Sequence, residues 1–324
     1  MFSTSTIVVS NAQQTSQNKG KVFVMYAASL VKTFEQTLGP LFEKKTGYTY
    51  VGEARGSVQI ANMIIDGQRR PDIFVSAGTI PIMKLMNNNN DSGGNQQLHQ
   101  PPLAQWLVKF ASAEMVIAYS PTSKFHLDLD KAKNGQTQWY QVLSQSGFKF
   151  GRTDPELDPK GYYMVIAAKL ANIYYNDQNI RQRILGQDGN PKQIFPEETL
   201  TTTLESGQLD AIAAYKHEAI AKGLPYIALP FQINLGNPAF SDFYKKALYT
   251  SAIGKTVYGE PIYFSVTIPE STVSNLAGAV SFVTFLLSSD GQRVLQIQGL
   301  DHIKPVVEGK MNKIPIDIKN MIYR

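Results

Sequence analysis

Small polar side chains stand at three predicted junctions between a strand and a helix. Ser29 and Ser57 each follow an apolar, strand-like segment, and Asp158 directly precedes Pro159, a residue favoured in the first turn of a helix. A helix N-terminus presents free backbone N–H groups and the positive end of the helix dipole, so it attracts anions. Three such starts around one cleft would bind a tetrahedral oxyanion by hydrogen bonds, although each residue taken singly is also an ordinary helix cap.

The elements around these junctions alternate in the order of an α/β protein. Segments 21–26, 48–53 and 71–77 are predicted strands, and segments 30–46 and 58–67 between them have the apolar spacing of helices. This order predicts a parallel sheet with right-handed crossovers. The junctions then lie at the carboxyl ends of strands, where open α/β sheets bind their ligands.

The rest of the chain continues this pattern. Predicted strands cover residues 113–119, 149–152, 210–215, 226–229 and 261–269, and predicted helices cover 158–174, 216–222, 274–287 and 290–298. Residues 86–102 contain four consecutive Asn, two Gly and two Pro, which is typical of a surface loop. This loop includes a glycosylation sequon that begins at Asn90.

Composition excludes several kinds of chemistry. The 324 residues are 43% apolar and include no Cys, which describes a globular chain of about two domains without disulfides, thiolate metal sites or a Cys nucleophile. The four His have no ligand spacing, and no P-loop, dinucleotide fingerprint or Gly-x-Ser-x-Gly elbow is present. The net charge of +5 is spread along the chain, so nucleic-acid binding is not expected.

The N-terminal residues 1–19 are rich in Ser, Thr, Asn and Gln and contain one short apolar patch at 7–9. This pattern is typical of the remnant of an export signal with a polar spacer, or of a plain disordered tail. Because no run of 18 apolar residues exists, no segment is expected to span a membrane.

Tyrosines offer a second kind of ligand chemistry. Tyr162, Tyr163 and Tyr215 could supply phenolate ligands to ferric iron, but packing in the core explains buried tyrosines more simply. Asp and Glu are numerous, and no pair of them stands out for acid–base catalysis. Hydrolysis through Asp158 therefore lacks a recognisable partner in the sequence.

Read in order, several segments resemble the molybdate/tungstate-binding proteins of ABC importers, in their archaeal-type branch. The resemblance rests on the segments 27–30 (Ala-Ala-Ser-Leu), 53–58 (Glu-Ala-Arg-Gly-Ser-Val), 71–77, 110–119, 151–162, 204–215, 229–235 and 282–299. Segment 151–162 (Gly-Arg-Thr-Asp-Pro-Glu-Leu-Asp-Pro-Lys-Gly-Tyr) is the most specific. The series covers about residues 20–305.

The resemblance implies a type II periplasmic-binding-protein fold: two α/β lobes joined by two crossover strands, with the ligand in the cleft. The first lobe would comprise residues 20–112 plus 265–324, the second lobe 113–264, and residues 1–19 the tail.

By match with the family, Ser29 and Ser57 would donate hydrogen bonds from the first lobe. Asp158 and Tyr215 would contribute from the second lobe, with Ala113 nearby at the crossover.

One position departs from the family pattern. In the family, two carboxylates complete a six-coordinate tungsten or molybdenum, and Asp158 matches the first of them as a direct metal ligand. The second falls on Ala214, whose methyl group cannot coordinate a metal, while Glu218 lies four residues further on. The anion is then four-coordinate and held by hydrogen bonds, or the register differs, or the ligand has changed.

The resemblance also implies a monomer without cofactor or catalysis, located outside the cell and tied to the membrane through a missing or processed N-terminal anchor. Its partner would be the membrane permease of an ABC importer. Sulfate, phosphate or ferric iron stay open as other ligands. An enzyme on a two-lobe scaffold and the sensing domain of a regulator are further alternatives, but no helix-turn-helix supports the last.

Overall fold

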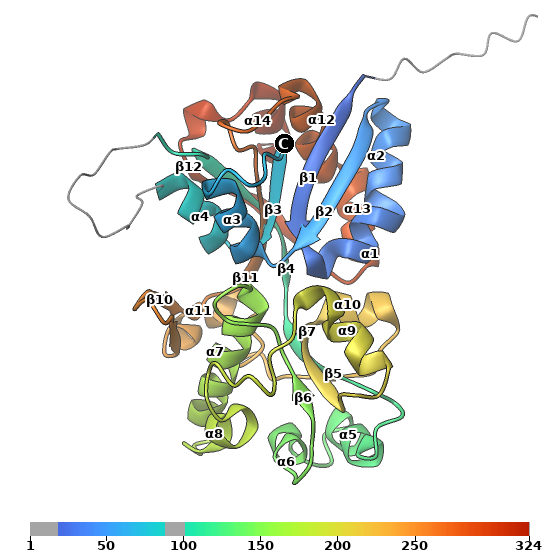
Figure 1. Ribbon diagram of the computed structural model, residues 1–324, viewed down its shortest axis with the longest axis vertical. Coiled ribbons are helices and arrows are strands. Elements are labelled where there is room, and N and C mark those ends of the chain that lie inside the picture. Colours follow the sequence, from blue (N-terminus) through green and yellow to red (C-terminus); the bar gives the residue numbers. More distant parts are fainter. Residues whose placement is uncertain (1–18, 88–100, 324) are drawn as a thin grey trace, which may run out of the picture.

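The computed structural model describes residues 19–87 and 101–323. Within these ranges the chain forms two α/β lobes, stacked one above the other in Figure 1, each built on its own sheet. The sequon at Asn90 and all but the last residue of the predicted tail lie outside the described residues. In the described ranges, no helix has both the length and the apolar character needed to cross a membrane.

A six-stranded mixed sheet organises the first lobe. Its strands, in order across the sheet, are β12 (Asp301–Gly309), β4 (Trp106–Ala113), β11 (Ile262–Thr267), β3 (Ile73–Ala77), β1 (Lys21–Ala27) and β2 (Thr49–Arg55). β1 pairs in parallel with β2 and β3, as predicted, whereas β11 and β12 run antiparallel to β4. The carboxyl ends of β1, β2 and β3 therefore meet at one edge, which points toward the second lobe (Figure 1).

Helices cover both faces of this sheet. Successive side chains of a strand point to opposite faces, and the strands here carry apolar side chains on both, so each face is buried. Met25 of β1 lies in the cluster under α3 (Ser57–Ile65) and α4 (Ile80–Asn87). Its neighbours Val24 and Tyr26 lie in the larger core on the opposite face. The helices there are α2 (Gly39–Thr46), α12 (Leu276–Leu287), α13 (Ser289–Ile297) and α14 (Ile316–Ile322).

The helix predicted after β1 is irregular. It starts as a 3₁₀ turn, η1 (Ala28–Leu30), continues through α1 (Val31–Thr33) and widens into the π-helical η2 (Phe34–Leu38) before α2. Pro40 in α2 has no N–H to donate, so the carbonyl one turn before it loses its usual partner. The widening precedes this proline, and the sequence-based expectation of one regular helix is wrong in this detail.

A four-stranded sheet organises the second lobe. Its order is β6 (Phe150–Gly151), β7 (Ala211–Tyr215), β5 (Met115–Tyr119) and β8 (Tyr226–Ala228). The helices around it are α5 (His126–Lys133), α6 (Trp139–Leu143), α7 (Pro159–Tyr174), α8 (Ile180–Leu185), α9 (Glu197–Glu205), α10 (Lys216–Lys222) and α11 (Ser241–Tyr244). The 16-residue α7 buries most of its length and forms the central helix of this lobe.

The chain passes from the first sheet to the second at Glu114, between β4 and β5. The predicted single strand 113–119 is therefore two strands in two sheets, and Ala113 belongs to the first of them. The chain returns through the segment before β11, where Ile262 N–H donates to Leu235 C=O. The residue limits of the lobes, at 113 and 264, stay a prediction.

Several short or exposed strands have no counterpart among the predicted elements. β12 is an edge strand in which exposed and half-buried positions alternate and Pro305 interrupts the apolar pattern. β9 (Leu248–Thr250) and β10 (Thr256–Tyr258) form a separate two-stranded hairpin beside α7. Such strands lack the continuous apolar run by which buried strands are recognised.

Candidate functional site

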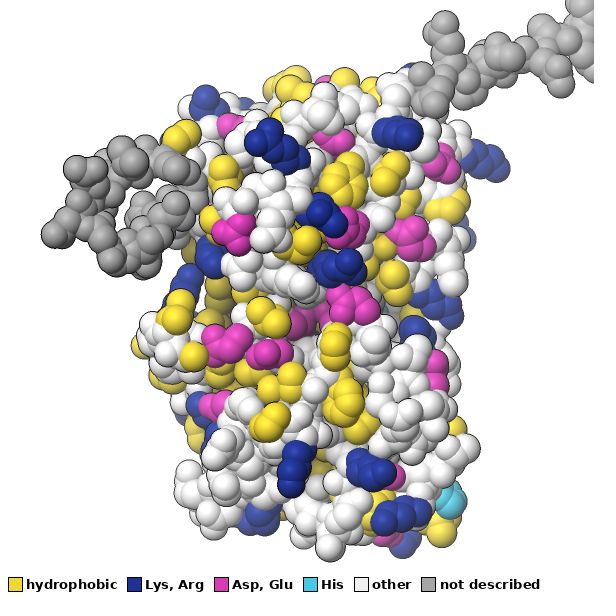
Figure 2. All heavy atoms as spheres, in the orientation of Figure 1, with side chains coloured by type: hydrophobic (Ala, Val, Ile, Leu, Met, Phe, Trp, Pro, Cys, Tyr) yellow, Lys and Arg dark blue, Asp and Glu magenta, His cyan; other side chains and the backbone are white. Residues whose placement is uncertain are grey.

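The junctions predicted from the sequence meet where the two lobes touch. Gln59 N–H, in the first turn of α3, donates to Leu157 C=O, just before α7, at 3.2 Å. Gly56 allows this approach, because a Cβ at that position would lie 2.8 Å from the same carbonyl oxygen. On the face shown in Figure 2, acidic side chains gather along this boundary, with basic side chains above and below.

Asp158 caps α7 and also lies at this boundary. Its Oδ1 accepts hydrogen bonds from Lys160 N–H at 2.8 Å and from Thr153 Oγ1 at 2.9 Å, and the residue is 4% exposed. The position of a Cβ on Gly56, across the boundary, would be 3.3 Å from Asp158 Oδ2. One carboxylate oxygen thus holds the helix start, and the other is turned toward the first lobe.

Ser57 is fully buried at the first residue of α3. Its Oγ does not cap the helix but accepts a hydrogen bond from Ala77 N–H, at the end of β3, at 3.0 Å. Among the described residues no acceptor takes the hydroxyl hydrogen, which leaves it available to a bound anion.

Ser29 and Tyr215 approach the boundary from opposite lobes. Ser29 lies in η1 and its Oγ is buried without a hydrogen-bond partner in the described part of the chain. Tyr215, the last residue of β7, is fully buried, and its Oη is likewise unpartnered there. Its ring stacks on His217 at 5.6 Å and meets Phe264 edge-on at 5.9 Å, which fixes the orientation of the phenol.

Two further phenols join this group. A Cβ on Gly78, just after β3, would lie 3.0 Å from Tyr163 Oη and 3.3 Å from Tyr162 Oη, and both hydroxyls lack partners among the described residues. Burial, together with nearby acids, raises the pKa of each tyrosine well above its usual value. In the absence of a bound cation these side chains are therefore neutral and can donate hydrogen bonds.

Unpartnered buried polar atoms are rare, and leaving one unsatisfied costs about 1–3 kcal/mol. Ser29, Tyr162, Tyr163 and Tyr215 place four such hydroxyls near one boundary. Because each can donate a hydrogen bond, the group is suited to an anion enclosed between the lobes. Ala113, 1% exposed at the end of β4, offers only backbone groups. The ligand roles of Ser29, Ser57, Ala113, Asp158 and Tyr215 stay a prediction.

An ion-pair cluster that the sequence did not reveal lies beside Asp158. Lys160, 2% exposed, places Nζ 2.9 Å from Glu218 Oε1 and 3.3 Å from Glu197 Oε1. Burial alone disfavours the charged form of Glu218, but Lys160 and His217 hold its pKa below the usual value. Burial and the charge of Asp158 raise the pKa of Glu197 well above its usual range, against the opposing effect of Lys160.

Ala214 pairs with Val116 in the sheet and packs in an apolar cluster with Leu200 and Leu204 of α9. Its match with the family's second carboxylate position stays a prediction. Glu218 already has two partners: its Oε2 accepts from Tyr215 N–H at 2.9 Å, at the start of α10, and its carboxylate pairs with Lys160.

A pocket of about 560 Å³ opens at this boundary. Gly56 and Gln59 line it from the first lobe, and Asp158, Pro196 and Glu197 line it from the second. The pocket therefore gives access to the carboxyl groups that flank the start of α7.

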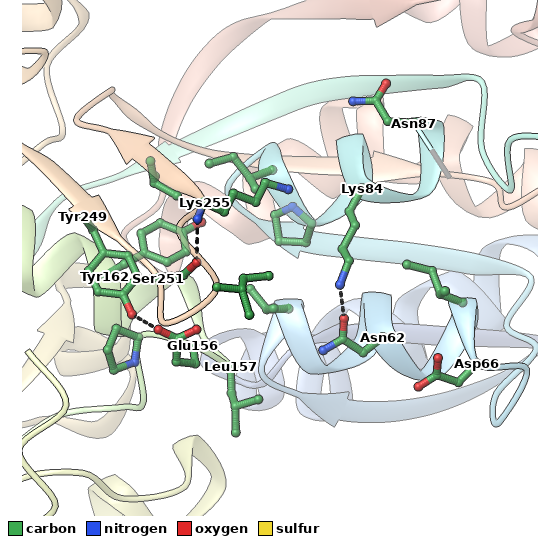
Figure 3. Close-up of a pocket in the computed structure, with 17 residues that line it drawn as sticks. Asn62, Asp66, Lys84, Asn87, Glu156, Leu157, Tyr162, Tyr249, Ser251 and Lys255 are labelled. Atoms are coloured by element: carbon green, nitrogen blue, oxygen red, sulfur yellow. Dashed lines mark hydrogen bonds between the residues drawn. The ribbon is translucent and has the colours of Figure 1, made fainter. Parts of the chain in front are cut away.

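A second pocket, of about 750 Å³, lies on the other side of Leu157, between α3, α4 and the β9–β10 hairpin (Figure 3). Some of its polar groups have partners: Lys84 Nζ donates to Asn62 Oδ1 at 2.5 Å, and Tyr249 Oη donates to Glu156. Tyr162, whose Oη is unpartnered among the described residues, also lines this pocket. In the described ranges, no group of three or more His, Asp and Glu is arranged to hold a metal ion.

Known solute-binding proteins share sequence with this chain along most of its length. The family described as bacterial extracellular solute-binding protein matches residues 22–301. An uncharacterized solute-binding protein of Petrotoga mobilis is 31% identical over 94% of this chain and 90% of its own length. The molybdate/tungstate-binding protein of Pyrococcus abyssi is 31% identical over 95% of this chain and 92% of its own length.

Among solved structures, the periplasmic molybdate-binding protein of Azotobacter vinelandii superposes with a TM-score of 0.56. The two sequences are 17% identical, and the match covers 86% of this chain and 98% of the other. At this identity the likeness concerns the fold alone, and it confirms the expected periplasmic-binding-protein architecture.

Proposed function

Because the chain belongs to the family of bacterial extracellular solute-binding proteins, we propose that it captures molybdate or tungstate and delivers the anion to an ABC importer. The observation that carries this proposal is the set of buried, unpartnered hydroxyl donors at the lobe boundary, from Ser29 on one side to Tyr215 on the other. A tetrahedral oxyanion accepts hydrogen bonds in all directions, so one bound ion can satisfy donors from both lobes at once.

Selectivity against sulfate would follow from size and coordination. Molybdate and tungstate have longer metal–oxygen bonds than sulfate has sulfur–oxygen bonds. A smaller anion would leave at least one donor unmatched, at a cost of about 1–3 kcal/mol. Asp158 would add a second filter, because its carboxylate repels sulfate but can donate an oxygen lone pair to a metal centre.

The proposal also covers the location of the protein, its oligomeric state and its partner. The protein would work outside the cell as a monomer, tied to the membrane through an N-terminal anchor. It would present its closed form to the permease and catalyse no reaction. The contact between the lobes supports this picture, since closure around a ligand is a common motion of two-lobe binding proteins.

Calorimetric titration tests the proposal directly. The purified protein is titrated with tungstate, molybdate and sulfate, and then with ferric citrate. We expect one-to-one binding of tungstate or molybdate and no heat with sulfate. Absence of binding to tungstate and molybdate would refute the ligand assignment, and binding of ferric citrate would favour the tyrosine-based iron site instead.

A further inference from the structure

Glu197 is a buried carboxyl group that the known family pattern does not explain. It is the first residue of α9, and its side chain is 4% exposed. Lys160 Nζ lies 3.3 Å from its Oε1, but apart from the carboxyl group of Asp158 its buried Oε2 has no hydrogen-bond partner among the described residues. A buried carboxylate oxygen in that state calls for an additional partner.

Glu197 lies on the face of α9 that packs against β7, at the end of the helix next to the candidate ligand site. Residues three and seven positions apart lie on one face of a helix, and Leu200 and Leu204, at those spacings from Glu197, pack on Ala214 of β7. Glu197 therefore projects from the same face, one turn closer to the lobe boundary. It comes from the helix that covers the strand position where the family has its second carboxylate.

Glu197 and Asp158 act on each other electrostatically and line the same pocket, with Gly56 opposite them in the first lobe. Asp158 uses Oδ1 to cap α7, and Glu197 uses Oε1 to accept from Lys160. Each carboxyl group thus has one oxygen held by a donor elsewhere in the protein. The two carboxyl groups also share a side-chain hydrogen bond, and Oδ2 and Oε2 have no other donor in the described part of the chain. Lys160 orients Glu197 and offsets part of the negative charge that two acids bring to one site.

We propose that Glu197 supplies the second carboxylate oxygen to the bound oxyanion, in place of the side chain that Ala214 lacks. This inference rests on the proposed function and deepens it. Glu197 and Asp158 would each donate an oxygen lone pair to the hexavalent metal, which keeps its four oxo groups and becomes six-coordinate. No bond breaks and no oxidation state changes, and any proton shared by the two acids passes to solvent.

The test compares Glu197→Gln with the unaltered protein. The amide keeps the size of the side chain and an oxygen that can accept from Lys160, but it is a much poorer metal ligand. Loss of even an outer-shell partner of a metal ligand costs about 10–100-fold in affinity, so we expect tungstate binding to weaken by at least about tenfold. Glu205→Gln, the same change at the exposed end of α9, is the matched control and should bind as the unaltered protein does.

X-ray absorption at the tungsten edge provides a second readout that stability does not affect. The unaltered protein should hold six-coordinate tungsten, and Glu197→Gln should hold tungsten of lower coordination number. A four-coordinate spectrum in the unaltered protein, or identical spectra and affinities in both proteins, would overturn the role of Glu197. If the unaltered protein binds neither tungstate nor molybdate, the proposed function itself fails. Circular dichroism and thermal melting establish that the variants are folded.

Discussion

Ser29 and Ser57 occupy equivalent positions in the sequence pattern, but their hydroxyl groups have different surroundings. Ser29 Oγ has no partner in the described part of the chain, whereas Ser57 Oγ accepts from Ala77 N–H. A hydroxyl without a protein partner contributes to ligand binding alone. A hydroxyl that already satisfies a buried N–H contributes to the fold as well.

Alanine substitutions should separate these two roles. Ser29→Ala should change the free energy of unfolding by no more than about 0.5 kcal/mol, and it should weaken anion binding by about 1.5–3 kcal/mol, the value of one hydrogen bond to a charged group. Ser57→Ala should also destabilise the ligand-free protein by about 1–3 kcal/mol, because Ala77 N–H loses its acceptor. Urea unfolding and calorimetric titration measure the two effects. Equal destabilisation by both changes, with unaltered affinities, would contradict the distinction.

Asp158→Asn isolates the charge of Asp158 from its capping role. Asparagine caps helices about as well as aspartate, so the free energy of unfolding should change by no more than about 0.5 kcal/mol. Tungstate binding should weaken at least about tenfold if the carboxylate donates to the metal. Titration with tungstate decides the matter, since tighter binding by the variant would mean that the charge repels the anion.

Residue patterns indicate some residues of the candidate site and give no signal for others. Ser29, Ser57 and Asp158 stand next to strand ends and helix starts, which are visible in the sequence. Glu197 is 39 positions from Asp158 and looks like any acidic residue in the first turn of a helix. Only the packing of α9 on β7 brings it beside Asp158, so no local signal could have identified it.

Among the elements, α7 depends on an ion pair that its own first turn supplies. Lys160 is almost completely buried between Glu218 of α10 and Glu197 of α9, so it ties three helix starts together. Removing one partner of a buried ion pair leaves an uncompensated charge, which costs about 3–5 kcal/mol. Lys160→Met should therefore destabilise the protein by about that amount at pH 7, measured by urea unfolding.

The control and the pH dependence make this prediction specific. Lys45→Met removes an exposed pair with Asp290 and should cost no more than about 1 kcal/mol.

Because the pKa of Glu218 is lowered in the folded protein, the ion pair between Glu218 and Lys160 stabilises the fold above the ordinary carboxyl pKa of 4.5. This contribution is lost as the pH falls through the lower, folded-state pKa of Glu218. The difference in free energy of unfolding between Lys160→Met and the unaltered protein should therefore shrink at that low pH. A difference that stays constant with pH would be inconsistent with the ion pair.

The elements that the sequence predicts best are those with a strong apolar period. β1, α7 and β7 begin and end within about two residues of their predicted limits, because continuous apolar runs and Pro159 mark them. The break of the predicted strand 113–119 at Glu114 was not predictable, because the residues on both sides of Glu114 are buried and apolar. The edge strand β12 was not predicted, because its side chains are largely exposed and form no apolar run.

At the scale of the whole molecule, the structure shows the two lobes in contact. Arg55 of the first lobe pairs with Glu198 of the second at 3.8 Å, on the same side as the contact between Gln59 and Leu157. Lys32 Nζ donates to Ala221 C=O near the other end of the boundary. Contacts at both ends keep the intervening hydroxyls buried, whereas the pocket of about 560 Å³ leaves an opening to the carboxyl groups of Asp158 and Glu197.

Gly56 is the position at which closure can be tested without disturbing either lobe. Its φ of −59° is open to any residue, so Gly56→Ala introduces no backbone strain. The added Cβ would lie 2.8 Å from Leu157 C=O and 3.3 Å from Asp158 Oδ2, atoms of the opposite lobe. The substitution should therefore leave the stability of each lobe nearly unchanged and disfavour the closed arrangement, which weakens anion binding.

Small-angle scattering and titration with tungstate together check this prediction. Gly56→Ala should have a larger radius of gyration than the unaltered protein in the presence of the ligand, and its affinity should fall by about tenfold or more, since overpacking costs about 1–3 kcal/mol. Gly189→Ala is the matched control, because a Cβ there meets nothing within 4 Å. Unchanged affinity and scattering in Gly56→Ala would mean that the ligand is held without the contact between α3 and the start of α7. The site would then belong to one lobe rather than to the closed pair.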